Sequence, residues 1–209
     1  MKSIKPTFVI ESSINENDIL KHLEKAGRTA YKSEDKITED SASKFINMIM
    51  NRGHLSVIEH SYITVRVICD RGVSHEIVRH RLASYTQEST RYCNYAKGKF
   101  GNEITVIEPC FWNPQDQKYQ IWKETITNIE VNYNKLISLG ATPQEARSIL
   151  PNSLKTEIVM TMNLREWLHF FELRTAKAAH PQMREIAIPL LKEFQKKLPV
   201  IFSIIKLDE

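Results

Sequence analysis

Residues 79–92 carry an unusual density of side chains that bind anions. They read Arg-His-Arg-Leu-Ala-Ser-Tyr-Thr-Gln-Glu-Ser-Thr-Arg-Tyr, with three arginines, one histidine and several hydroxyl groups. Arginine offers a planar fork of donors that matches phosphate oxygens, and hydroxyl and backbone N–H groups complete an anion cradle. A phosphorylated ligand is therefore the first chemical hypothesis. A solvated polar loop is the alternative, because surface charges commonly serve solubility.

The order of these residues adds a family resemblance to that chemistry. Arg-His-Arg, two residues, Ser, four residues and a second Ser resemble RHRxxSxxxxS, the signature of flavin-dependent thymidylate synthases. Further pieces resemble the same family in the same order along the chain. They are Gly53–His60 (GHLSVIEH), Ala146–Pro151 (ARSILP), Asn163–Arg165 (NLR) with His169, Leu173-Arg174, and His180–Gln182 (HPQ). The resemblance thus extends over most of the chain.

The resemblance implies an activity, its cofactors and an assembly. The implied reaction is the reductive methylation of dUMP to dTMP, with 5,10-methylenetetrahydrofolate as carbon donor, FAD reduced by NADPH as hydride source and no enzyme cysteine as nucleophile. The residues implied to contact FAD are Ser56, Arg79, His80, Arg81, Gln87, Asn163, Arg165 and His169. Those implied to contact the nucleotide are Glu76, Ile77, Val78, Arg79, Gln87, Glu88, Ser89, Thr90, Arg91, Arg147 and Arg174. Because the two sets interleave along one segment, we expect the family's homotetramer, with sites shared between subunits.

Arg174 is the residue to which the resemblance gives a catalytic role. As charge moves into a uracil ring, its carbonyl oxygens and N3 become anionic, and a fixed guanidinium beside them lowers the barrier. We therefore expect Arg174 to stabilise the activated ring. Arg147 and Arg91 are expected to bind the phosphate or the base of the nucleotide.

The chain departs from the family's pattern at two of these positions. Glu76 stands where some members carry Gln, and a carboxylate near a phosphorylated substrate needs an arginine or a proton beside it. Gln87 stands where other members carry Glu, so this position keeps its hydrogen bonds but loses its charge. An acid–base role is not expected at residue 87.

Simpler interpretations exist for several of the same residues. His54 and His60 lack the HExxH pattern, so structural histidines are favoured over ligands and no metal site is predicted. Arg147 alone would be interpreted as an exposed helix arginine, and Asn163 as a helix cap that is still able to face a ligand.

Helical spacing explains how the C-terminal part of the motif set could meet one ligand. Asn163 with Glu166 predicts a capping box before a helix over 164–178. Arg165 and His169 lie at i and i+4 on one face of that helix. Leu168, Phe170 and Phe171 are expected to pack inward rather than against a flavin.

The elements around these motifs indicate a mixed α+β fold. Strands are expected at residues 7–11, 62–69, 103–108 and 155–161. Helices are expected at 16–31, 39–51, 74–81, 115–139, from Thr142-Pro143, 164–178 and 183–197. The regular alternation of a doubly wound sheet is missing. The resemblance implies a mixed or antiparallel central sheet flanked by helices, in a single domain over residues 1–209.

Composition excludes several other classes. The 42% hydrophobic and 26% charged content of the 209 residues is typical of a globular domain. No long apolar run or signal-peptide pattern occurs, which favours a cytoplasmic protein. The three widely spaced cysteines Cys69, Cys93 and Cys110 predict free thiols, and the GxGxxG and GxxxxGK fingerprints are absent.

Two alternative functions stay open from the sequence. One is a nucleic-acid-binding module that uses the basic residues of 79–91 with Tyr85, Tyr92 and Tyr95, although the net charge of +4 is mild for that role. The other is a flavoprotein of the same fold with different chemistry. A yellow colour of the purified protein excludes only the first.

Overall fold

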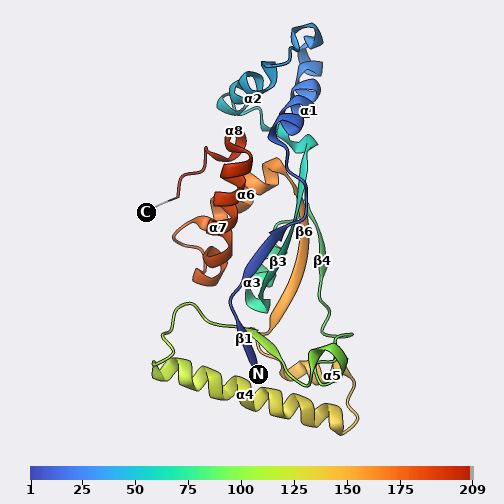
Figure 1. Cartoon of the computed structure of the whole chain (residues 1–209), viewed down its shortest axis with the longest axis vertical. Coiled ribbons are helices and arrows are strands. Elements are labelled where there is room, and N and C mark those ends of the chain that lie inside the picture. Colours follow the sequence, from blue (N-terminus) through green and yellow to red (C-terminus); the bar gives the residue numbers. More distant parts are fainter. Residues whose placement is uncertain (208–209) are drawn as a thin grey trace. The chain divides into compact units, whose positions relative to one another are not determined.

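The computed structural model describes residues 1–207, apart from the side chain of Lys99, and confirms the mixed α+β class (Figure 1). The strands are β1 (Lys2–Ile4), β2 (Thr7–Ile10), β3 (Tyr62–Asp70), β4 (Ala83–Gln87), β5 (Thr105–Ile107) and β6 (Lys155–Asn163). The helices are α1 (Glu16–Arg28), α2 (Ser41–Asn51), α3 (Arg71–Ile77), α4 (Gln117–Ser138), α5 (Pro143–Ala146), α6 (Leu164–Thr175), α7 (Pro181–Lys197) and α8 (Pro199–Phe202). Short 3-10 helices are η1 (Thr29–Tyr31), η2 (Glu34–Lys36), η3 (Leu55–His60), η4 (Gly98–Phe100) and η5 (Arg147–Ile149).

The central sheet has four strands in the order β2-β3-β6-β4 and is mostly antiparallel. Residues alternate between buried and less buried along β3 and β6, as expected for strands with one face on a core. β3 and β6 run antiparallel, because the Leu164 amide donates to the Ser61 carbonyl at one end and the Arg71 amide to the Leu154 carbonyl at the other. A separate parallel pair joins β1 to β5.

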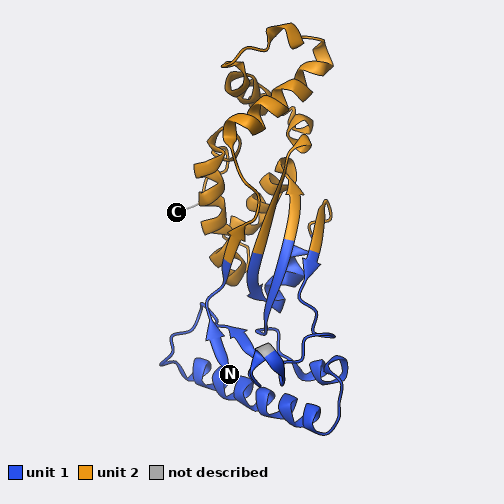
Figure 2. Cartoon of the chain, turned by 45° about the vertical axis from the view of Figure 1, so that its right-hand side comes forward, with its two compact units in different colours: residues 1–7, 67–79, 86–159 blue, residues 8–66, 80–85, 160–209 orange. Residues whose placement is uncertain are grey.

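Contacts divide the chain into two compact units, each made of three segments (Figure 2). Unit 1 comprises residues 1–7, 67–79 and 86–159, and unit 2 comprises 8–66, 80–85 and 160–209. The strands β2, β3, β4 and β6 each contribute residues to both units. A single domain over 1–209 stays a prediction.

Unit 2 has an aromatic core. Trp167, Phe170 and Phe171 of α6 are buried, with Phe194 of α7 and Phe202 of α8 packed against them. The indole Nε1 of Trp167 donates to the carbonyl of Ile63 at 3.1 Å. The inward packing of the Phe170-Phe171 pair, expected from helical spacing, is confirmed.

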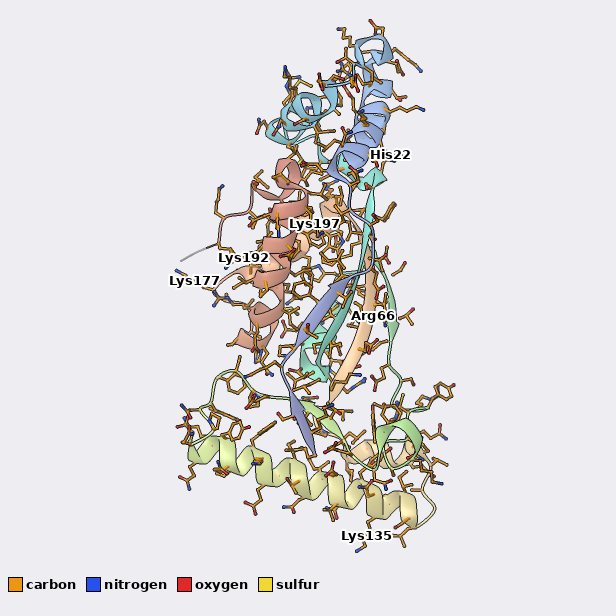
Figure 3. All side chains as sticks on the ribbon, viewed as in Figure 1. His22, Arg66, Lys135, Lys177, Lys192 and Lys197 are labelled. Carbon is orange, nitrogen blue, oxygen red and sulfur yellow. The ribbon has the colours of Figure 1, made fainter. Side chains whose placement is uncertain are left out.

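Unit 1 has a smaller core around the long helix α4. Tyr133 and Ile126 of α4 are buried together with Tyr95, Val106 and Leu154. The opposite side of α4 carries charged residues, and the labelled Lys135 near its C-terminal end is exposed (Figure 3). None of the helices within residues 1–207 is both long and apolar enough to cross a membrane.

Two helices predicted in the motif segments have bounds that differ from the observed ones. The helix expected at 74–81 is α3, which begins at Arg71 because the Asp70 side chain accepts a hydrogen bond from the Val73 amide at 2.7 Å. It ends at Ile77, so Arg79 and Arg81 lie beyond it. The helix expected at 164–178 ends at Thr175.

Two strands were missed. β1 is a three-residue strand that pairs only with β5, and its hydrophobic pattern is too short to predict. β4 lies inside the segment interpreted as a polar loop, and its alternating exposure places polar side chains along a strand at one edge of the sheet. The alternative of a solvated polar loop over residues 79–92 is therefore wrong for 83–87.

Candidate functional site

A cavity of about 580 Å³ in unit 2 brings together part of the predicted FAD set. Asn163, Arg165 and His169 line it, and they come from the end of β6 and the first turns of α6. Glu59 of η3 and Glu172 of α6 also line it. The cavity has the volume of an ordinary small-molecule site and mixes cationic donors with apolar walls from Leu55, Leu82 and Leu168.

Two side chains of α6 present donors at this cavity. Arg165 and His169 are both exposed. Their i, i+4 spacing places them on one face of α6, as predicted. Arg165 Nη1 lies 2.6 Å from Glu59 Oε1, and both side chains keep considerable exposure, 54% and 41%. An exposed ion pair of this kind contributes little to stability and is readily rearranged around an anionic ligand.

Asn163 begins α6. Its Oδ1 accepts a hydrogen bond from the Glu166 amide at 2.8 Å, so the predicted N-cap is confirmed. Glu166 does not complete the predicted capping box. Its carboxylate oxygen Oε1 instead lies 3.0 Å from His80 Nδ1. Glu166 therefore contacts a residue of the predicted site.

His80 is the most enclosed member of the predicted FAD set. Only 3% of it is exposed, and both ring nitrogens have protein partners: Nδ1 meets Glu166, and Nε2 accepts from Arg174 Nε at 3.1 Å. The rings of Phe170 and His169 lie 5.0 Å and 5.5 Å from its own. The structure thus joins His80 of the RHR sequence to the predicted catalytic arginine within unit 2. A direct contact of His80 with FAD stays a prediction.

Ligand atoms of His80, Glu166 and His169 lie within 4.8 Å of one another, a spacing that a metal ion would need. The guanidinium of Arg174 donates to the same imidazole, however, and a fixed cation beside the cluster opposes binding of a second one. A hydrogen bond joins His80 to Glu166, and an edge-to-face ring contact joins His80 to His169, so the three groups lie close together without an ion.

The predicted nucleotide residues belong mainly to unit 1. Ser89, Thr90 and Arg91 follow β4, and Arg147 Nη1 donates to Thr90 Oγ1 at 3.4 Å. Arg147 is exposed and Thr90 is buried. The guanidinium of Arg91 lies 5.5 Å from the Tyr92 ring centre. Residues 57 positions apart in the sequence therefore meet, and Arg147 is not an isolated surface arginine.

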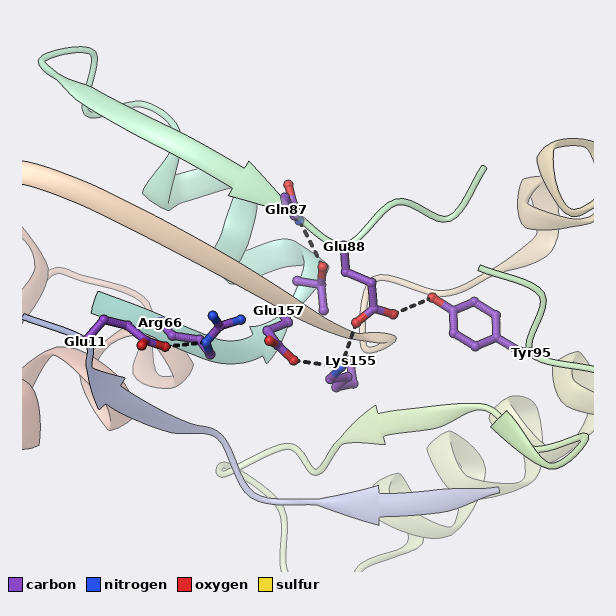
Figure 4. Close-up of polar contacts among 8 residues, drawn as sticks. Glu11, Arg66, Gln87, Glu88, Tyr95, Lys155 and Glu157 are labelled. Atoms are coloured by element: carbon purple, nitrogen blue, oxygen red, sulfur yellow. Dashed lines mark hydrogen bonds and ion pairs between the residues drawn. The ribbon is translucent and has the colours of Figure 1, made fainter. Parts of the chain in front are cut away.

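Gln87 and Glu88 have structural partners in unit 1 (Figure 4). The Gln87 amide donates to Ser74 Oγ at 2.9 Å and to Thr156 Oγ1 at 3.1 Å. The Glu88 carboxylate accepts from Lys155 Nζ at 2.6 Å and from the Tyr95 hydroxyl at 3.0 Å. These bonds hold the end of β4 in place. Contacts of either residue with FAD or the nucleotide stay predictions.

The remaining predicted residues differ in exposure. Ser56, Arg79 and Arg81 are exposed, as is Val78, which follows α3, whereas Glu76 is half-buried. Ile77 is fully buried, so only its backbone would be available to a nucleotide.

Comparison with known proteins decides the family. The model of the family described as thymidylate synthase complementing protein matches residues 13–200. A flavin-dependent thymidylate synthase of Pyrococcus furiosus is 36% identical over 172 residues, which cover 82% of this chain and 70% of that protein. The chain belongs to the flavin-dependent thymidylate synthase family. Proteins of the same name from Geobacter sulfurreducens (32% identical, covering 80% of this chain and 71% of that one) and Corynebacterium diphtheriae (30%, covering 93% and 81%) are also similar.

Burial limits the reactivity of one cysteine in this member of the flavin-dependent thymidylate synthase family. Cys69, Cys93 and Cys110, which all lie in the described part of the chain, form no disulfide. Cys69 is buried on β3, and burial raises the pKa of its thiol far above the ordinary value. A thiol that stays protonated is a poor nucleophile.

Three acidic side chains that line the cavity, Glu59, Glu166 and Glu172, were not predicted as site residues of this family member. Glu59 was noted only as part of the GHLSVIEH segment, and Glu166 only as a partner in a capping box. The signal for Glu166 is its place on α6, one turn before His169 and about two turns before Arg174. The contact with His80, 86 residues away, is not visible in the sequence.

Stability is expected to fall below pH 6.5 through His80. Burial lowers the pKa of His80 from its ordinary 6.5, and the charge of Arg174 lowers it further, although the Glu166 carboxylate opposes both. Between the folded-state pKa and 6.5 the unfolded chain binds a proton that the folded chain resists, so the free energy of unfolding decreases as pH falls through this window. Urea titrations at pH 7.5 and 5.5 measure it.

The control for this prediction is His80→Gln, which has no titrating ring. Its decrease between the two pH values is expected to be smaller than that of the wild type. An equal decrease would show that other groups account for it.

Proposed function

We propose that this chain is a flavin-dependent thymidylate synthase that converts dUMP to dTMP, with 5,10-methylenetetrahydrofolate as carbon donor and NADPH as reductant of FAD. The observation that carries the proposal is the contact between His80 of the RHR segment and Arg174, beside a cavity lined by Asn163, Arg165 and His169. These residues come from separate family motifs, and a fold that merely placed polar residues on its surface would give no such contact.

The cavity suits FAD by its donor set. Arg165 and His169 offer cationic or neutral N–H donors for pyrophosphate oxygens or ring edges, and Ser56 and Arg81 are exposed in the same unit. We assign FAD binding to these residues with Asn163, and to Arg79 and Gln87 of unit 1. When bound, reduced FAD supplies the hydride.

Within the chain itself, the arginines divide the work on dUMP. Arg147 and Arg91 bind the phosphate or base, supported by Thr90, which already accepts a hydrogen bond from Arg147. Arg174 stabilises the negative charge that develops on the uracil carbonyl and N3 as electron density enters the ring. No thiol is needed. We assign substrate contacts also to Glu76, Ile77, Val78, Glu88 and Ser89, and propose a homotetramer whose subunits share each site.

The test is tritium release from C5-labelled dUMP in the presence of FAD, NADPH and methylenetetrahydrofolate. Release that requires all four components, with dTMP formed in equal amount, is the expected result. Bound flavin without release would leave a flavoprotein of other chemistry, and a colourless protein that binds single-stranded nucleic acid would favour the alternative module.

Arg147→Ala is expected to raise the KM for dUMP by about 10- to 100-fold, because a hydrogen bond to a charged group is worth about 1.5–3 kcal/mol. Changes in kcat should be much smaller, since a phosphate contact binds ground and transition states alike. Steady-state kinetics at saturating folate measure both. Lys135→Ala, which removes an exposed cation of α4, should leave the KM unchanged.

A further inference from the structure

We propose that Glu166 and His80 act together as positioning residues, which hold the Nε edge of Arg174 and fix the imidazole in a single neutral tautomer. The inference rests on the proposed function in one respect, the action of Arg174 on the uracil ring. It assigns to Glu166 a role in the reaction, and to His80 a role other than contact with a cofactor.

The hydrogen bonds determine the tautomer. A guanidinium has donors only, so His80 Nε2, which lies 3.1 Å from Arg174 Nε, must be the unprotonated acceptor. The ring proton therefore resides on Nδ1 and is donated to Glu166 Oε1 at 3.0 Å. By accepting the Nδ1 proton, Glu166 selects the tautomer in which Nε2 can accept from Arg174.

The imidazole is also held against rotation. His80 is 3% exposed, its ring packs 5.0 Å from that of Phe170, and its backbone carbonyl accepts from the Tyr85 hydroxyl at 2.7 Å. Arginine has large rotamer freedom, which a rigid acceptor at Nε removes before any substrate binds. The bond to His80 engages the Nε–H of the guanidinium.

Burial and the charge of Arg174 favour the neutral His80 ring, whereas the Glu166 carboxylate opposes them. The groups that face the ring are Glu166, Arg174 and His169 from α6 and Tyr85 from β4. Protonation at Nε2 would place an N–H against the guanidinium, and burial together with Arg174 lowers the pKa of His80. The carboxylate of Glu166 acts in the opposite sense and raises it. The pH dependence of turnover therefore reports on this contact.

Two substitutions of His80 separate positioning from packing. The glutamine amide extends to about the place of Nε2, where its oxygen accepts from Arg174, whereas the asparagine amide extends to about the place of Nδ1 and keeps only Glu166. We expect kcat for tritium release to fall by about 10²-fold in His80→Asn, the loss typical of a misplaced catalytic group, and by less than about tenfold in His80→Gln. Equal losses, or a smaller loss in His80→Asn, would overturn the proposal.

Glu166→Gln tests the proposed role of Glu166 through a pH profile. Loss of the carboxylate charge lowers the pKa of His80 further, so the acid limb of kcat/KM for dUMP should move to lower pH. Glu124→Gln on the exposed side of α4 is the matched control and should leave the limb in place. An unmoved limb in Glu166→Gln would contradict the proposal even if His80→Asn failed to fold.

The wild-type protein separates the two hypotheses. If it releases no tritium, the proposed function fails. The alternative outcome is that the wild type is active while His80→Gln and His80→Asn lose activity equally, although both variants match it in bound flavin and thermal stability. In that case only the positioning inference fails.

Discussion

Arg174→Ala is expected to lower kcat for thymidylate formation by about 10²- to 10³-fold, the typical cost of removing one preorganised donor from a developing anion. The side chain is half-buried on the last turn of α6 and is held by His80, so the charge is oriented before the reaction begins. Single-turnover and steady-state tritium release measure the loss. The KM for dUMP should change less than kcat if Arg174 acts mainly on the transition state.

Arg66→Ala is the matched control for Arg174→Ala. Arg66 lies on β3 in the same unit and forms an ion pair with Glu11 in which both side chains are over a third exposed (labelled in Figure 3). Its removal should leave turnover within about twofold, because exposed ion pairs contribute at most about 1 kcal/mol. Comparable losses of turnover in both variants would mean that removing any arginine from unit 2 lowers turnover. Arg174 would then have no special role.

Trp167→Ala is expected to reduce the free energy of unfolding by about 3–5 kcal/mol, the usual cost of deleting a buried large aromatic side chain. Trp167 is fully buried, and the rings of Phe171 and Phe194 lie 5.5 Å and 4.9 Å away. The substitution also leaves the Ile63 carbonyl without its 3.1 Å donor. Denaturant unfolding followed by far-UV circular dichroism measures the change.

Two controls define this result. Trp167→Phe keeps most of the volume but removes the N–H, so its cost should be clearly smaller than that of Trp167→Ala. Tyr62→Ala removes an aromatic side chain that is 62% exposed and should change stability by about 0.5 kcal/mol or less. A Trp167→Ala cost as small as that of Tyr62→Ala would contradict the assignment of Trp167 to the core.

Helix α6 illustrates what local pattern predicts. Its start follows from Asn163, its buried face from the spacing of Leu168, Phe170 and Phe171, and its exposed face from Arg165 and His169. These features depend on residues within two turns of one another, where backbone geometry alone relates them. The sequence therefore predicted which side of the helix is buried and which is exposed.

Segment 79–92 illustrates where local pattern fails. Its polar composition predicted no strand and left a solvated loop as an alternative, yet residues 83–87 form β4 because β6 supplies the hydrogen-bond partner. Strand formation depends on a neighbour that lies far away in the chain, which a window of sequence does not contain. The exposed alternation of β4 followed from its place at the sheet edge.

By itself, the sequence determined the family, the mixed α+β class and the residue types available for phosphate and flavin chemistry, because these depend on side-chain identity and order. Tertiary structure alone decided the partners of those residues. Glu166 became the partner of His80, and Arg147 the partner of Thr90, across 86 and 57 positions. Contacts at such separations arise only when distant elements pack, so burial, tautomer and the orientation of Arg174 follow from the fold.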